Sequence, residues 1–257
     1  MDDLISSCSS IFSAKQLKHE LIYFFSGAGI QLHKWSSNCK ELLSNFNVSD
    51  GDVSLTIPDE TKALGLLWRS EKDTLAFSVC YIADVSDSCT ITKRSILSAT
   101  ARIFDPLGLI SPVVTNSKLV KQGLWRLNLN WNDSLPIHLE TQWKQFVKSL
   151  VAINNLNIPR YILLDDALRI ELHGYCDNSL RVYGDTIYVK CLHNSGTVST
   201  SLLCSKSRIA LLKSVTIPRL ELFAAVFLAK LIQKTIKSMK INFNDIVLWT
   251  ESTIVLA

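Results

Sequence analysis

The pattern of apolar and polar positions divides the chain into a mixed first part, a helical middle and a strand-rich end. Apolar residues at helical spacing predict a helix over residues 14–25, which the Ser-Gly-Ala-Gly run at 26–29 would end. Alternating apolar and polar residues then predict three strands, of which the last two flank the polar run 69–73 as a hairpin. These predicted strands are 30–35, 63–68 and 74–82.

The spacing changes from about residue 92 onward, where apolar positions recur every three to four residues. Three helices are predicted, over 92–104, 112–127 and 136–151, and proline stands at the start of the last two. The Asn-rich stretch at 154–159 indicates a boundary after them.

The remaining residues are typical of an α/β unit. Three consecutive strands precede a helix that begins near Pro218, and a short apolar strand follows that helix. A meander that feeds a sheet, then a helix and a further strand, favours an α/β fold for this part, after an α+β first part. The predicted strands are 168–176, 182–192, 198–205 and 245–250, and the helix is 218–236.

Composition narrows the class of protein. Hydrophobic residues make up 47% of the 257 residues, and the 9 Gly and 6 Pro are too few for a disordered or collagen-like chain. No apolar stretch is long enough to cross a bilayer, and the acidic start Met1-Asp2-Asp3 is unlike a signal peptide. Seven scattered Cys without a C-x-x-C pair exclude a disulfide scaffold and a zinc ribbon. We therefore expect an intracellular protein, cytoplasmic or nuclear and not secreted, with no membrane partner.

Charge is unevenly distributed along the chain. Residues 1–89 hold 7 Lys/Arg and 12 Asp/Glu, whereas residues 90–135 hold 6 and 2. A basic helical segment of this kind is what a phosphate backbone would attract, although a solvated helix face explains the same charges. The candidate nucleic-acid-binding residues are Lys93, Arg94, Lys118, Lys121 and Arg126.

Three carboxylates of the last part are candidate catalytic and metal-ligating residues. Asp177 follows a predicted strand, Glu221 lies in the first turn of the predicted helix, and Glu251 follows the last strand. Bridging carboxylates can hold two divalent cations that activate water and stabilise a leaving phosphate oxygen, and such hard ligands suit Mg²⁺ or Mn²⁺. Taken singly, each residue also has a structural explanation, as a turn former, a favourable helix-start charge or an exposed strand end.

Several longer runs resemble the Pol polyprotein of Bel/Pao long-terminal-repeat retrotransposons, in the segment known as the Pao retrotransposon peptidase family. The runs are IFDPLGLISP at 103–112, HGYCDNS at 173–179, TIPRLEL at 216–222 and LWTES at 248–252, with LHKWSSN at 32–38 and ALGLLW at 63–68 upstream. The resemblance covers essentially the whole chain.

The resemblance implies the end of a reverse transcriptase, a member of the DNA/RNA polymerase superfamily, followed by a ribonuclease-H-like region. Residues 1–90 would be a palm and thumb remnant, 91–157 a basic helical connection, and 158–257 a truncated ribonuclease-H-like domain. Asp2 and Asp3 would be what remains of the polymerase metal box. Expected partners are an RNA–DNA hybrid or other nucleic acid and the rest of the Pol polyprotein, and the expected cofactor is Mg²⁺ or Mn²⁺.

Departures from the family pattern indicate an impaired enzyme. Position 251 is Glu where the family has Asp, and the extra methylene moves the carboxylate by about 1.5 Å in a site that tolerates only ~0.5 Å. The polymerase fingers and a fourth nuclease carboxylate are not present, and Asp185 replaces a small apolar residue. The peptidase activity is implied only by the family name, since no Asp-Thr-Gly or Asp-Ser-Gly turn occurs.

Three functions remain open from the sequence. The first is a Pol fragment that is catalytically impaired and associated with nucleic acid. The second is an active divalent-metal ribonuclease H that cuts RNA in RNA–DNA hybrids. The third is a non-catalytic module that binds nucleic acid or protein.

Overall fold

The structure is a computed structural model that describes most of the chain as two compact units. One unit contains residues 1–78 and 155–160, and the other contains residues 79–154 and 161–257. Asp2 and Asp3 lie outside the described residues. The described ranges are 4–32, 35–43, 60–63, 66–79, 90–163, 167–212, 215–239 and 241–256.

The first unit joins a helix to a small antiparallel sheet. The predicted hairpin is confirmed: β2 and β3 pair antiparallel around a turn in which Asp73 adopts a positive φ of 48°. The side chain of Asp73 accepts a hydrogen bond from Trp68 Nε1 at 2.9 Å and pairs with Arg160, which follows β4. The elements are α1 (Ile11–Gly27), the 3₁₀ turn η1 (Lys40–Leu42), β1 (Thr61–Ala63), β2 (Leu66–Arg69), β3 (Thr74–Ala76) and β4 (Ile158–Pro159).

One prediction for this unit differs from the structure. The strand predicted over 30–35 is not formed by its described residues, 30–32 and 35. The stretch predicted as a boundary, 154–159, supplies β4, which pairs with β3 and returns the chain to this sheet. Asparagine marks the turn before β4, but it gives no signal for a two-residue strand whose pairing partner lies far away in the sequence.

Three helices open the second unit, as the spacing predicts: α3 (Lys93–Ala101), α4 (Ser111–Arg126) and α5 (Ile137–Leu150), followed by η2 (Val151–Asn155). Thr92 begins α3 with a reciprocal capping box, in which its side chain accepts from Ser95 N and Ser95 Oγ accepts from Thr92 N. The buried faces of the helices include Ile96, Leu124 and Trp143.

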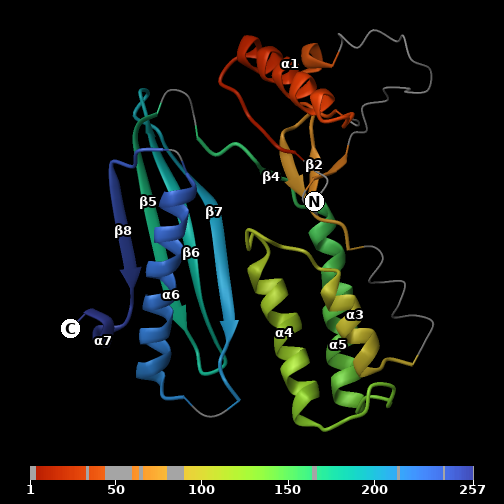
Figure 1. The fold of residues 1–257 in the computed structure, drawn as a ribbon. Coiled ribbons are helices and arrows are strands. Elements are labelled where there is room, and N and C mark those ends of the chain that lie inside the picture. Colours follow the sequence, from red (N-terminus) through yellow and green to blue (C-terminus); the bar gives the residue numbers. More distant parts are fainter. Residues whose placement is uncertain are drawn as a thin grey trace. The chain divides into compact units, whose positions relative to one another are not determined.

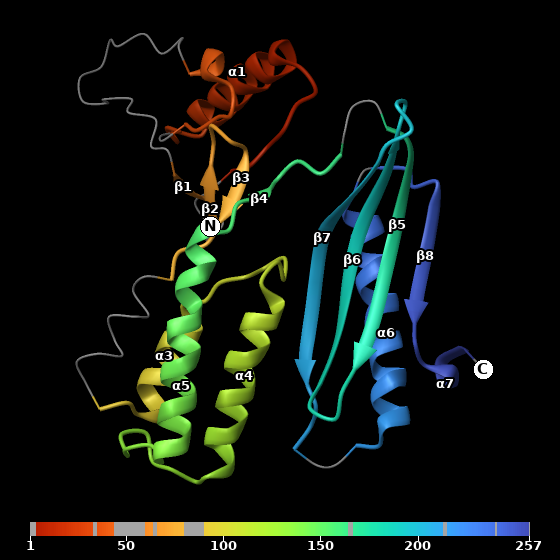
Figure 2. The same cartoon turned by 180° about the vertical axis from the view of Figure 1, so that it is seen from behind.

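A four-stranded sheet forms the rest of the unit, in the order β7-β6-β5-β8. The predicted meander is confirmed, since β5, β6 and β7 pair antiparallel, and β8 returns parallel to β5 after α6. Figures 1 and 2 show that α6 covers one face of this sheet only. The elements are β5 (Ala167–Asn178), β6 (Val182–His193), β7 (Val198–Ile209), α6 (Ile217–Ser238), β8 (Asp245–Thr250) and α7 (Thr253–Leu256).

The core of this part lies between the sheet and α6. Leu172 and Ile187 from the strands are completely buried against a cluster that includes Leu228 and Ile232 of α6. Gly174 makes this approach close, because an added Cβ there would lie 2.9 Å from Leu228 Cδ1 and 3.1 Å from Ile232 Cδ1. One glycine in the middle of β5 therefore sets how near the helix sits.

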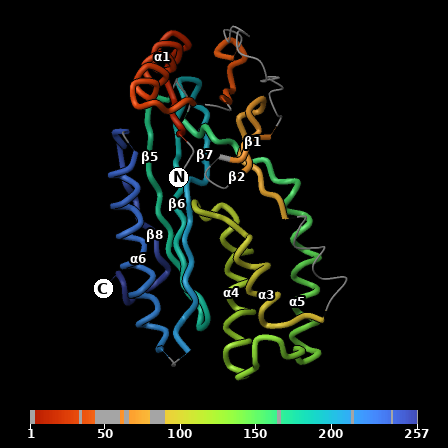
Figure 3. The backbone as a smooth tube through the Cα atoms, turned by 45° about the vertical axis from the view of Figure 1, so that its right-hand side comes forward, coloured from red at the N-terminus to blue at the C-terminus, as the bar shows by residue number. Residues whose placement is uncertain are grey.

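The edge of β7 is covered by the turn before α4, which is the run IFDPLGLISP. Ser205 N donates to Leu107 O at 2.8 Å, so the turn adds a backbone contact to an edge strand. Gly108 has a φ of +75°, and an added Cβ would lie 1.9 Å from Ser205 O. Asp105 closes the turn by accepting from Leu109 N and Ile110 N at 2.8 and 2.9 Å. The run thus joins the helices to the sheet, and Figure 3 shows α4 beside the strands.

Candidate nuclease site and nucleic-acid interface

The three candidate carboxylates belong to one end of the sheet. Cys176 of β5 pairs with Thr250 of the parallel strand β8, so Asp177 and Glu251 come next on neighbouring strands. Both strands point toward the end at which α6 begins (Figure 1), and Glu221 lies in the first turn of α6. A hydrogen bond of 2.6 Å from Ser252 Oγ to Glu221 Oε2 ties α6 to the residue after Glu251.

The same sheet separates Asp177 from Glu221. Successive residues of a strand point to opposite faces, and the side chain of Cys176 belongs to the core beneath α6. Because β5 continues regularly to Asn178, which pairs with Tyr183, Asp177 points to the face away from α6. Asp177 is exposed, and its Oδ1 accepts from the backbone N of Asn178 at 2.6 Å.

These carboxylates do not form a two-metal site. In the part of the chain that the structure describes, no three His, Cys, Asp or Glu side chains come together in a way that could hold a metal ion. The oxygen donors are of the type that Mg²⁺ and Mn²⁺ prefer, but Glu221 is held by Ser252 and Asp177 faces the other way. No hydrolytic step can be derived through a metal from this arrangement.

Asp185 is the most unusual carboxylate in the sheet. It lies on the α6 side of β6, is 2% exposed, and neither carboxylate oxygen has a hydrogen-bond partner among the described residues. Burial raises the pKa of Asp185 to about 8, so the group holds its proton at neutral pH. Its neighbours across the strands are Cys176 and Lys206. Asp185 therefore puts a carboxyl group on the covered face of the sheet, at a position where the family pattern has a small apolar residue.

Lys93 differs from the expectation that it faces a nucleic acid. The residue is 6% exposed, and its Nζ lies 3.8 Å from the centroid of the Trp125 ring and 5.4 Å from that of Trp131. Nζ also donates to Leu129 O at 3.3 Å. The position begins α3 next to the loop after α4, and the spacing of charges in the sequence does not reveal that two Trp side chains enclose it.

The other four basic candidates lie at or near the surface of α3 and α4. Arg94 is exposed and donates from Nε to Asn132 Oδ1 at 3.1 Å, and Arg126 is exposed in the last turn of α4. Lys118 and Lys121 are half-buried on one side of α4. Burial and the neighbouring Lys118 ammonium lower the pKa of Lys121.

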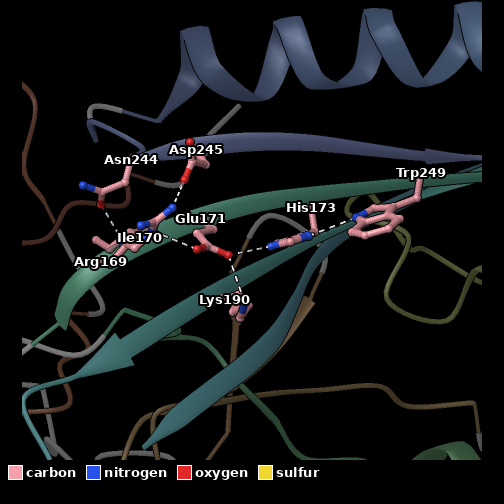
Figure 4. Close-up of polar contacts among 8 residues, drawn as sticks. All are labelled: Arg169, Ile170, Glu171, His173, Lys190, Asn244, Asp245 and Trp249. Atoms are coloured by element: carbon pink, nitrogen blue, oxygen red, sulfur yellow. Dashed lines mark hydrogen bonds and ion pairs between the residues drawn. The ribbon is translucent and has the colours of Figure 1, made fainter. Parts of the chain in front are cut away.

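A polar network on the open face of the sheet was not predicted from the sequence. Glu171 accepts hydrogen bonds from Lys190 Nζ at 3.0 Å and from His173 Nε2 at 2.9 Å, and Trp249 Nε1 donates to His173 Nδ1 at 3.0 Å (Figure 4). The hydrogen bonds from His173 and Lys190 lower the pKa of Glu171 to about 2. Both ring nitrogens of His173 are engaged, so the network positions Trp249. The signal in the sequence is the i, i+2 spacing of Glu171 and His173 on one strand.

Residues 92–252 match the family model described as the Pao retrotransposon-like RNaseH-like domain. The chain belongs to this family. The match begins at the capping residue of α3 and ends at Ser252, so the helices α3–α5 and the sheet with α6 belong to one family domain. No curated protein matches the chain.

Two solved structures match this chain at low similarity. They are a foamy viral protease–reverse transcriptase in complex with double-stranded DNA and the dRH form of that protein, also with double-stranded DNA. The identities are 14% and 12%, each match covers 77% of this chain, and both TM-scores are 0.41. This chain spans 38% and 32% of their lengths, and at this level of similarity neither match assigns a function. Among the described residues, no helix is long and apolar enough to cross a membrane.

Proposed function

We propose that this Pao-family chain is a segment of a retrotransposon Pol polyprotein that associates with nucleic acid and hydrolyses RNA in RNA–DNA hybrids poorly or not at all. The observation that carries the proposal is the separation of the candidate carboxylates. Glu221 lies on the α6 side and is bonded to Ser252, whereas Asp177 points to the opposite face of the sheet. In this proposal residues 1–90 correspond to a reverse transcriptase remnant, 91–157 to a connection and 158–257 to the ribonuclease-H-like part.

Hydrolysis by two metal ions requires both ions at a nearly fixed separation, so that one delivers hydroxide and the other stabilises the leaving oxygen. Asp177, Glu221 and Glu251 have the charge for this chemistry without the geometry. Mg²⁺ or Mn²⁺ would supply the activated water when bound, and we expect this chain to bind either ion no better than in the millimolar range. Association with nucleic acid is supported by three basic residues of α4: Arg126, which is exposed, and Lys118 and Lys121, which are half-buried on one side of the helix.

The test is cleavage of a labelled RNA–DNA hybrid in the presence of Mn²⁺. The unaltered chain, Asp177→Asn and Glu251→Asp are each expected to stay near background, because correcting the reach of one carboxylate does not bring Asp177 to the face of Glu221. Ser252→Ala, combined with Glu251→Asp, removes the hydrogen bond to Glu221. This double variant tests whether that bond keeps Glu221 from binding a metal ion.

Cleavage by the unaltered chain that disappears in Asp177→Asn would overturn the impaired-enzyme part of the proposal and establish an active ribonuclease H. Absence of hybrid binding at low salt, measured with the same chain by fluorescence anisotropy, would contradict the nucleic-acid part. Hybrid binding without cleavage in all variants is the expected result.

A further inference from the structure

A groove between α4 and β7 lies beside the turn that contains Gly108. Its narrower part is a cavity of about 330 Å³, and its wider part is a cavity of about 610 Å³. Lys118 of α4 lines both parts. We call this feature the α4–β7 groove, and the side chains that matter are Lys118, Lys121, Trp125, Lys206 and Arg208.

The groove is strongly positive. Lys118 and Lys121 come from α4, and Lys206 and Arg208 come from β7. In the described part of the chain none of the four forms an ion pair with a carboxylate within 4.0 Å. Lys118, Lys206 and Arg208 line the narrower part and Lys121 lines the wider part, so their charges create a potential that attracts an anion.

The one carboxylate that lines the groove already accepts hydrogen bonds from the backbone. Asp105 lines the narrower part, but its two oxygens accept from Leu109 N and Ile110 N. Burial raises the pKa of Asp105 above its ordinary value, although these hydrogen bonds and Lys118 oppose the rise. The positive charges of the groove therefore exceed its negative charge.

The ammonium groups of Lys118 and Lys121 on α4 repel each other. Burial lowers the pKa of Lys121, and the neighbouring Lys118 ammonium lowers it further because like charges repel. A phosphate placed between the two ammonium groups would offset their repulsion.

The walls of the groove are fixed by hydrogen bonds between the helices and the sheet. Gln122 Nε2 donates to Ala210 O at 2.8 Å, and the hydroxyls of Thr115 and Ser207 are hydrogen-bonded to each other. Together with the contact of Ser205 with Leu107, these bonds join α4 to β7 along their length. A ligand would meet a preformed surface and would not have to order it.

The ends of the groove add planar surfaces. Trp125 lines the wider part and is 48% exposed. At the narrower part, the Arg208 guanidinium lies 4.7 Å from the centroid of the Phe227 ring, which holds it in place. An exposed Trp beside a line of cations suits a ligand with regularly spaced phosphates and flat rings.

We propose that the α4–β7 groove binds the sugar–phosphate backbone of one nucleic-acid strand, with Lys118, Lys121, Lys206 and Arg208 on the phosphates and Trp125 against a base or ribose. The inference rests on the proposed association with nucleic acid and assigns it to a site. It also replaces the expected surface around Lys93 by one that unites the helical segment with the ribonuclease-H-like sheet.

The test measures the affinity of the full chain for a 20-base-pair RNA–DNA hybrid as a function of salt, without divalent metal. The triple variant Lys118→Gln, Lys206→Gln, Arg208→Gln is compared with Lys148→Gln, Lys230→Gln, Lys234→Gln. The second variant removes three positive charges from exposed positions of α5 and α6 outside the groove. Glutamine retains most of the side-chain length, and circular dichroism verifies that both variants keep the fold.

The groove variant is expected to bind at least about tenfold more weakly at low salt and to reduce the slope of log affinity against log salt by ~3, about one for each lost phosphate contact. The control variant is expected to keep the slope. Equal losses in both variants would overturn the groove and leave the proposed function intact, because binding would then follow net charge alone. Absence of binding by the unaltered chain at low salt would overturn both.

Discussion

Helices α1 and α6 are both rich in apolar residues, yet α1 buries none of its side chains and α6 packs against a sheet. The 17 residues of α1 include no buried side chain, and Phe12, Tyr23 and Phe24 are 79%, 85% and 72% exposed. Along the 22 residues of α6, six are buried, five of them between Leu220 and Ile232. An apolar helical pattern thus predicts a helix, whereas a sheet with matching apolar side chains decides whether the helix contributes to a core.

The difference follows from the strands that each unit offers. In the second unit β5, β6 and β7 have 12 residues each and present a broad face to α6. In the first unit β1 to β4 have two to four residues each. The family match at residues 92–252 coincides with the unit that has the larger core. We therefore expect stability to be concentrated in the second unit.

The largest expected effect comes from matched truncations in the two units. Leu172→Ala removes a side chain that is 0% exposed in the core beneath α6, and we expect a loss of ~2–5 kcal/mol in the free energy of unfolding. Phe24→Ala removes a larger side chain from α1 that is 72% exposed, and we expect a change within about 0.5 kcal/mol. Urea unfolding followed by circular dichroism measures both. Similar losses in the two variants would contradict the comparison.

A second test uses the buried carboxylate of the second unit. The pKa of Asp185 is raised to about 8 in the folded chain from 3.8, so the folded state holds a proton that the unfolded state releases. Stability is therefore highest below pH 4 as far as this group is concerned, and falls by up to ~1.4 kcal/mol per pH unit as the pH rises toward 8. Asp185→Asn should remove this dependence and raise the stability at pH 8.

Urea midpoints between pH 5 and pH 8 check this prediction. Glu221→Gln provides a control, since Glu221 is a carboxylate of the same unit that is hydrogen-bonded to Ser252. Identical pH profiles for the unaltered chain and Asp185→Asn would show that another group controls the dependence. Cys176 and Lys206, which lie across the strands from Asp185, would be the next groups to examine.

Much of the fold could be predicted because the spacing of apolar residues is a local property. The helices and the meander of the second unit follow their predicted ranges within a few residues, and the Asp177 and Glu251 positions at adjacent strand ends follow from β8 returning parallel to β5. The face to which Asp177 points could not be predicted. It depends on whether β5 continues regularly past Cys176, and a shift of one residue reverses it.

The features that could not be predicted from the sequence depend on contacts between distant segments. The burial of Lys93 needs Trp125 and Trp131 to meet around it, and the α4–β7 groove needs residues near 118 and near 206 to face each other. The family resemblance marked the run around Gly108 as characteristic without giving its physical reason. That reason is the close approach to Ser205, which is visible only in three dimensions.

A third prediction concerns that approach. Gly108→Ala places a Cβ 1.9 Å from Ser205 O and forces a side chain on a residue with φ of +75°. We expect a loss of about 2 kcal/mol, as the turn moves away from β7. Gly196→Ala is the matched control, because Gly196 lies in the turn between β6 and β7 of the same unit and also has a positive φ, of 80°, but an added Cβ would meet no atom within 4 Å. Thermal unfolding of both variants separates the stability loss caused by the steric clash from the loss caused by backbone strain. Equal stability losses would assign the whole effect to backbone strain.

The smallest expected effect compares the two helix starts. Thr92 caps α3 by accepting from Ser95 N at 3.2 Å, and Ser10 caps α1 by accepting from Ser13 N at 3.1 Å. Replacing a capping hydroxyl by Ala typically costs ~1 kcal/mol of helix stability. In α3 that loss should lower the urea midpoint, because Ile96 anchors the helix in the core.

In α1, which has no buried side chain, Ser10→Ala should increase amide hydrogen exchange in its first turn and leave the midpoint unchanged. Thr92→Ser retains the hydroxyl and should behave like the unaltered chain. A midpoint shift as large in Ser10→Ala as in Thr92→Ala would show that α1 is part of the cooperative core despite its exposure.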